Sequence, residues 1–167
     1  MEKWQIYVQE ARIQIRFAER SYHEFERCRD ASDCEGVFYH LHHFIAHVAA
    51  IERILNPKPN SPRAGVLADR VILNGIDIGP ACRMRNHLEH FDERLDKWIA
   101  KHHGYAFFDM NITTGSIGFP YQIALRALDG DTLRFLGEEY NLSELRGGIL
   151  EIDRHLASLE DGSAQRA

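Results

Sequence analysis

Two groups of histidines, each in a segment with helical spacing, are the residues of this sequence best suited to chemistry. The chain has ten histidines among its 167 residues. His40, His43 and His47 form one group, and the segment from 83 to 94 contains the other together with several arginines. A neutral imidazole can bind a metal or transfer a proton near neutral pH, and a guanidinium can hold a phosphate at two points. The sequence therefore offers two candidate sites with different chemistry.

The first group has spacings that suit a transition metal such as zinc. On a regular helix His40, His43 and His47 fall within about 60° of one another, so their imidazoles share one face. Neutral nitrogen donors suit such metals, although a carboxylate ligand would have to come from elsewhere in the chain. The same stripe also fits a packing interface between helices or subunits, or a direct catalytic role. The sequence leaves these three interpretations open.

The second group forms a polar face on a helix that is apolar on its opposite side. The apolar stripe consists of Met84, Leu88, Phe91, Leu95, Trp98 and Ile99. The polar face consists of Arg83, Asn86, His87, His90 and Arg94, within about 100° of arc, with Arg85 beside it. These residue types suit hydrogen-bond donation and proton transfer better than they suit an ordinary solvated helix surface.

Within this face, Arg85-Asn86-x-x-x-His90 resembles the signature of HEPN domains. These are small helical bundles that often dimerise, and many of them are metal-independent ribonucleases. Two long helices followed by a motif-bearing helix are also similar to the order of elements in that family. The resemblance covers residues 1 to 102 and the last helix, and it implies a homodimer that acts on RNA without a cofactor.

The resemblance also implies a role for each motif residue. His90 would transfer a proton at the ribose 2′-hydroxyl or the leaving oxygen, and Arg85 would hold the scissile phosphate. Asn86 would orient the imidazole or the phosphate, and the site would form where the motif helices of two subunits meet. His87 and Arg94 would support it.

Helix geometry leaves the partner of His90 open. Arg85 is about 140° from His90 around a regular helix, so it must reach around, or a second subunit must complete the site. Arg83, about 20° away, is the alternative partner in the same chain.

Three functions therefore remain open. The motif residues suit a ribonuclease site, but they equally suit a packing network or a ligand site in a non-catalytic interaction module. The stripe at His40, His43 and His47 adds a metal-binding bundle. The net charge of -5 disfavours nonspecific binding to nucleic acid, so any RNA site must be local and based on arginine.

Helices are predicted over about 3–27, from the turn at 32 to about 56, over 63–73 and 80–102, and from Asn141 onward. The second helix is expected to start at a capping box, Ser32-Asp33-Cys34-Glu35, and the fourth is expected to end before Gly104. Between the fourth and last helices, the segments 105–112, 121–128 and 132–136 are rich in aromatic and branched residues and are separated by turns.

The predicted fold is mainly α. It is a HEPN-like bundle of four to five helices with a small antiparallel hairpin or meander inserted at about 104–139, before the last helix. Residues 1–160 are expected to form one domain, followed by a frayed tail at 161–167. The lack of an apolar run of about 18 residues and of a signal peptide predicts a cytoplasmic protein without membrane contact. Cys28, Cys34 and Cys82 are odd in number and scattered, which predicts reduced thiols.

Overall fold

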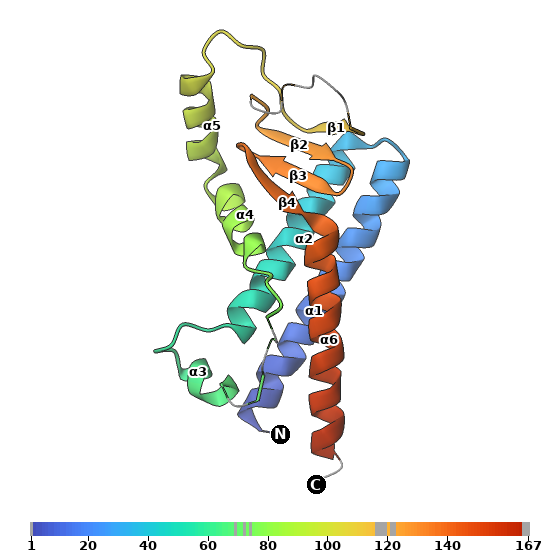
Figure 1. The fold of residues 1–167 in the computed structure, drawn as a ribbon, viewed down its shortest axis with the longest axis vertical. Helices are drawn as coiled ribbons and strands as arrows, with labels where there is room; N and C mark the ends of the chain where they lie inside the picture. The colour runs from blue at the N-terminus through green and yellow to red at the C-terminus, as the bar shows by residue number, and fades with distance from the viewer. Residues whose placement is uncertain are drawn as a thin grey trace.

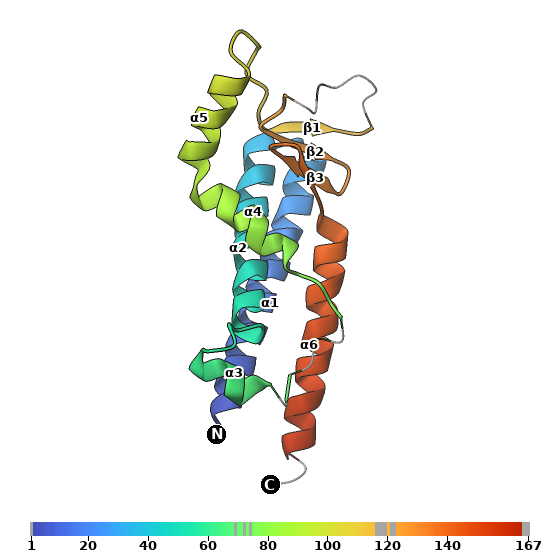
Figure 2. The same cartoon turned by 60° about the vertical axis from the view of Figure 1, so that its left-hand side comes forward.

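Two long antiparallel helices form the central hairpin of the fold. In the computed structural model, which describes residues 2–68, 70, 71, 73, 75–115, 120 and 123–164, these are α1 (Lys3–Asp30) and α2 (Cys34–Leu55). The last helix, α6 (Leu142–Ala164), runs along α1, and α4 (Pro80–Glu89) packs against α2 (Figure 1). A small sheet covers the end of the bundle where α6 begins (Figure 2). None of the described helices is both long and apolar enough to span a membrane.

Apolar stripes on the first two helices form the core of the bundle. In α1 the buried stripe includes Trp4, Val8, Ala11, Ile15, Ala18, Tyr22 and Phe25. In α2 it includes Val37, Phe38, Leu41, Phe44, Ile45 and Val48. Residues three and four apart share a helix face, so each stripe faces the other helix. Tyr22 joins the two stripes, because its ring makes edge contacts with Phe25 at 5.3 Å and Phe44 at 5.1 Å between centroids.

The start of α2 differs from the prediction by one residue. Asp33, not Ser32, is the N-cap, and its side chain accepts a hydrogen bond from the Gly36 amide at 3.0 Å. Ser32 has a φ of 58° and belongs to the turn that separates α1 from α2. The predicted capping box is therefore wrong, although the helix predicted to follow it is present.

The predicted meander is present and contains one more strand. The sheet has the order β1 (Asn111–Thr113), β2 (Arg126–Asp129), β3 (Thr132–Phe135) and β4 (Glu138–Asn141). The last three strands are antiparallel neighbours, whereas β1 pairs in parallel with β2. Of the predicted segment 105–112, only the last two residues belong to a strand, and residues 121 and 122 lie outside the described residues.

The fourth predicted helix is two helices. α4 ends at Glu89, α5 (Phe91–Lys101) begins at Phe91, and His90 between them has φ -109° and ψ 39°. α4 buries Met84 against the bundle, whereas α5 turns toward the sheet, where the Trp98 Nε1 donates to the Ile123 carbonyl at 2.8 Å. A continuous helix from 80 to 102 is therefore wrong, because its two halves pack on different partners.

The two other helix boundaries also differ from the prediction. α3 (Pro62–Leu67) is shorter than the predicted segment 63–73. α6 extends to Ala164, into the expected frayed tail. The predicted start of the last helix at Asn141 is confirmed, and Asn141 Oδ1 caps α6 by accepting from the Glu144 amide at 3.1 Å.

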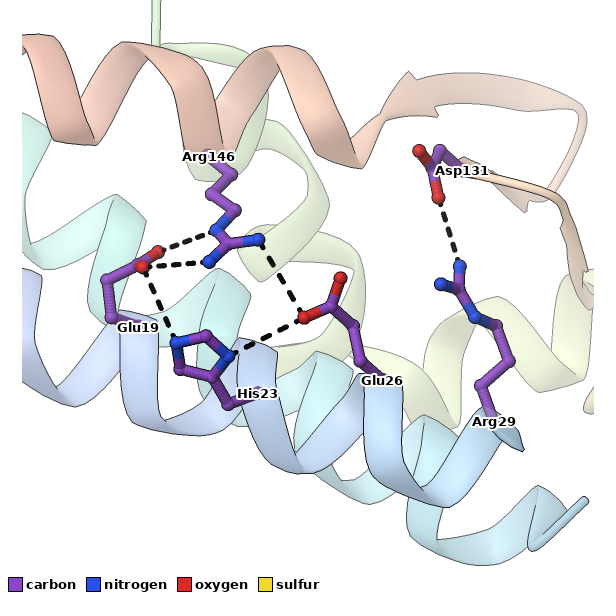
Figure 3. Close-up of polar contacts among 6 residues, drawn as sticks. All are labelled: Glu19, His23, Glu26, Arg29, Asp131 and Arg146. Carbon is purple, nitrogen blue, oxygen red and sulfur yellow. Dashed lines mark hydrogen bonds and ion pairs between the residues drawn. The ribbon is translucent and has the colours of Figure 1, made fainter. Parts of the chain in front are cut away.

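An arginine joins α6 to α1 through charged groups at the side of the core. Arg146 donates from Nε and Nη2 to the two carboxylate oxygens of Glu19, at 3.0 and 3.1 Å, and its Nη1 lies 3.7 Å from Glu26 (Figure 3). The Arg146 guanidinium also lies over the ring of Tyr22, 4.4 Å from the centroid. His23 lies between the same two carboxylates. This contact fixes the position of α6 along α1.

A second ion pair, more deeply placed, joins the sheet to the helices. Arg126 of β2 donates to both carboxylate oxygens of Asp109, at 2.9 and 2.5 Å, and both side chains are only 11% exposed. The Arg126 Nη1 lies 3.2 Å from His42 Nε2. Its guanidinium lies over the rings of Phe38 in α2 and Phe91 in α5. One arginine therefore holds together the sheet, α2 and α5.

Removing the charge of Asp109 should destabilise the fold strongly. In Asp109→Asn the mostly buried Arg126 loses its counter-charge, so we expect the free energy of unfolding to fall by about 3 kcal/mol in urea titrations. The matched control is Asp131→Asn, which breaks the more exposed pair with Arg29 (Figure 3) and should cost at most about 1 kcal/mol. Equal losses in the two variants would contradict the structural role of Arg126.

His42 should make the fold sensitive to acid. Burial, and then the positive charge of Arg126, lower the pKa of His42 from its ordinary 6.5 to about 4. Between these pH values the unfolded chain binds a proton that the folded chain does not, so stability falls as the pH falls from 6.5 to 4. We expect His42 to contribute up to about 3 kcal/mol to this loss, measured by urea unfolding across the range.

The comparison uses two variants. His42→Gln removes the titrating ring, so its stability should decline less between pH 6.5 and 4 than that of the wild type. His103→Gln replaces an exposed histidine and should keep the wild-type decline. Parallel curves for all three proteins would show that His42 has no such role.

Candidate functional site

Arg85 lies beside the helix break and forms an ion pair within its own helix. Its Nη2 donates to the carboxylate of Glu89, one turn further along α4. Its Nη1 is shielded from solvent and has no hydrogen-bond partner among the described residues. A shielded donor without an acceptor is costly. The Arg85 guanidinium therefore carries one shielded donor without an acceptor among the described residues.

His90 occupies the break itself, where the chain leaves α4. Its side chain is 51% exposed, and its Nδ1 lies 3.6 Å from the Glu93 carboxylate. Because the helix is interrupted here, angles around a regular helix no longer relate His90 to the arginines of α4. No hydrogen bond or ion pair joins Arg85 to His90 within the described chain, so a single copy does not bring the two motif residues into contact.

Arg83 and Asn86 are exposed on α4. Neither side chain takes part in a hydrogen bond or ion pair in the part of the chain that the structure describes. The other polar residues of α4 make hydrogen bonds or ion pairs. The donors of Arg83 and Asn86 are therefore available to a ligand that binds the exposed side of α4.

His87 and Arg94, expected to support the site, do come together across the break. The Arg94 Nε donates to His87 Nδ1 at 3.1 Å, which leaves the ring proton on Nε2, 3.3 Å from the Glu138 carboxylate. The His87 ring also stacks on Phe135, with 5.4 Å between centroids. Both ring nitrogens of His87 are engaged, so this side chain holds Arg94 and Glu138 in position.

Glu138 and Tyr140 of β4 extend this network, and sequence reasoning did not find them. The Tyr140 hydroxyl donates to Glu138 Oε2 at 2.6 Å. This bond, followed by His87 and Arg83, lowers the pKa of Glu138 against the opposing effect of burial. Burial and the Glu138 carboxylate raise the pKa of Tyr140 above its ordinary value. At neutral pH the pair is therefore a carboxylate and a neutral phenol.

A cavity of about 340 Å³ lies next to this network. It is enclosed by the start of α4, the strands β3 and β4, and the start of α6. Its lining includes Asp77, Arg83, Thr132, Glu139, Tyr140 and Glu144. Three carboxylates and one guanidinium give it a polar surface with a negative balance, which suits a ligand that carries an amine.

The described residues do not bring the histidines of the α2 stripe together around a common point. His47 Nδ1 lies 2.8 Å from the Gln14 amide oxygen, whereas His40 and His43 make edge contacts with the ring of Tyr39. Among the described residues, no three His, Cys, Asp or Glu side chains are grouped so that they could hold a metal ion. The fourth histidine of α2, His42, faces the core and binds Arg126 instead.

Comparison with known proteins identifies no relative: no protein-family model, curated protein or solved structure matches the chain.

Removing the Tyr140 hydroxyl should raise the pKa of Glu138. In Tyr140→Phe the strongest influence that lowers the pKa of Glu138 is lost, so this pKa should rise in a carboxyl NMR titration. The free energy of unfolding should fall by about 1 kcal/mol. Tyr39→Phe, at an exposed ring on α2, is the control and should change neither quantity. An unchanged Glu138 titration in Tyr140→Phe would contradict the network.

Proposed function

We propose that this chain is a HEPN-like RNA-binding bundle that acts as a homodimer and cleaves RNA without a metal. In the proposed site, Arg85 and Asn86 of one copy and His90 of the other act on the same phosphate. The observation that carries the proposal is the break at His90. It leaves this imidazole exposed at the surface while Arg85 stays on α4 with an unsatisfied donor.

Two copies are proposed because, among the described residues, Arg85 and His90 each form an ion pair with a neighbouring carboxylate and not with each other. Arg85 is paired with Glu89 and His90 lies near Glu93. An isologous contact between two α4–α5 edges would place the exposed His90 of each copy against α4 of the other. A phosphate that displaces Glu89 would bind across the two terminal nitrogens of Arg85 and satisfy the idle Nη1.

The proposed reaction uses proton transfer and charge stabilisation. His90 accepts the proton of the ribose 2′-hydroxyl, and the freed oxygen forms a bond to phosphorus. The bond from phosphorus to the 5′ oxygen then breaks, and that oxygen takes up a proton from water. Arg85 offsets the negative charge that grows on the phosphate oxygens, and Asn86 orients the phosphate.

Cleavage of mixed RNA by purified protein in EDTA tests this proposal. We expect wild-type protein to cleave, and His90→Ala and Arg85→Ala each to lose activity by about 100-fold or more. Mixing the two inactive variants after subunit exchange should restore about a quarter of the wild-type rate. Half of the dimers are then mixed, and each mixed dimer has one intact site out of two.

The control mixture is His90→Ala with His90→Gln, which contains no intact imidazole and should stay inactive. Restored activity only in the first mixture supports a site shared between copies. No cleavage by wild-type protein, or full cleavage by His90→Ala, would refute the catalytic proposal.

The cavity beside β4 favours a second candidate, a ligand-binding module without catalysis. Arg83 and Tyr140 lie at this cavity together with Asp77, Glu139 and Glu144, so it can offer both signs of charge to a small polar ligand. This candidate predicts a stable dimer in light scattering and no cleavage of RNA by the wild type. The same assay therefore separates the two functions.

A further inference from the structure

We propose that the exposed aromatic and basic end of α5 is a platform on which the bases of single-stranded RNA stack. The platform consists of Lys97, Lys101, His102, Tyr105 and Phe107. The inference rests on the proposed function for its substrate class, and it assigns to RNA a surface that the Arg85 and His90 motif does not include.

The aromatic rings of the platform are exposed but held in place. Tyr105 is 64% exposed and Phe107 is 56% exposed, in the loop that follows α5. Phe107 makes an edge contact with the buried Trp98 at 4.9 Å between centroids. The His102 ring lies 5.3 Å from Trp98 and 6.2 Å from Tyr105. The hydrogen bond from Trp98 to Ile123 anchors this row of rings to the segment before the sheet.

Two lysines give the platform the charge that a phosphate chain requires. The chain has only four lysines, and Lys97 and Lys101 lie one turn apart in α5. Neither makes an ion pair with another described residue. Together with Trp98 and His102 they line a cavity of about 80 Å³. Exposed rings beside unpaired cations are the combination that binds single strands without regard to sequence.

The distribution of charge along α5 separates the platform from the proposed cleavage site. The first half of the helix carries three carboxylates and one arginine that is bonded to His87, and the second half carries the two lysines. The 11 residues of α5 span roughly 16 Å, so His90 and the platform lie at opposite ends of the helix. A strand bound at both ends would pass the acidic half without phosphate contacts there.

Binding of a labelled oligouridine of about 12 nucleotides, followed by fluorescence anisotropy, tests the platform. The measurements use His90→Ala protein, so that the RNA stays intact. We expect the double substitution Tyr105→Ala and Phe107→Ala to weaken binding tenfold or more. Tyr39→Ala, at another exposed ring, should leave binding unchanged.

Conservative variants distinguish base stacking from nonspecific hydrophobic or electrostatic binding. Tyr105→Phe should bind as the parent does, whereas Tyr105→Leu should bind more weakly, because leucine has no π face. Lys97→Gln and Lys101→Gln should each reduce the slope of log K against log salt by about 0.7, whereas Lys58→Gln should not change it. A preference for an apolar peptide over oligouridine would assign the surface to a protein partner and overturn the proposal.

The platform and the cleavage site can fail separately. Weaker binding by the platform variants, with no cleavage by wild-type protein, upholds the platform and refutes the ribonuclease. Cleavage by the wild type together with unchanged binding by the platform variants upholds the ribonuclease and refutes the platform. If the protein binds no oligouridine at all, the platform is refuted whatever the cleavage assay shows.

Discussion

The ion pair between Arg126 and Asp109 is the contact on which the arrangement of the other elements depends. A guanidinium largely removed from water is tolerated only where fixed partners surround it. Here the partners come from three separate places in the chain, because Arg126 contacts Asp109, His42 and Phe38 of α2, and Phe91 at the start of α5. Each partner loses much of its freedom, so the sheet, α2 and the start of α5 are positioned together.

The break at His90 follows from this arrangement. Phe91 packs on the Arg126 guanidinium and against Phe135, so the first residue of α5 contacts the sheet. Met84, two turns earlier in α4, is buried in the helical bundle. A straight helix cannot make both of these contacts, and the chain bends at His90, directly before Phe91. His90 is exposed at the point where the chain turns from the bundle toward the sheet.

These couplings explain what could be predicted from the sequence. α1, α2 and α6 carry long apolar stripes, and burial of such a stripe determines a helix by itself. The break at His90 could not be predicted, because Met84, Leu88 and Phe91 continue one stripe through it. β4 was missed because only Tyr140 of its four residues is buried, so the alternation typical of a strand is hidden among exposed polar residues. Glu138, the carboxylate partner of His87, comes from this strand and was missed with it.

The histidines differ in function because their surroundings differ. His42 is held neutral by burial and by Arg126, and His87 has both ring nitrogens engaged, so neither is free for proton transfer. His90 is exposed, and its Nδ1 lies 3.6 Å from the Glu93 carboxylate. A high histidine content therefore does not require a metal. In the proposed mechanism the exposed imidazole acts as the base, while the more buried ones maintain the geometry that exposes it.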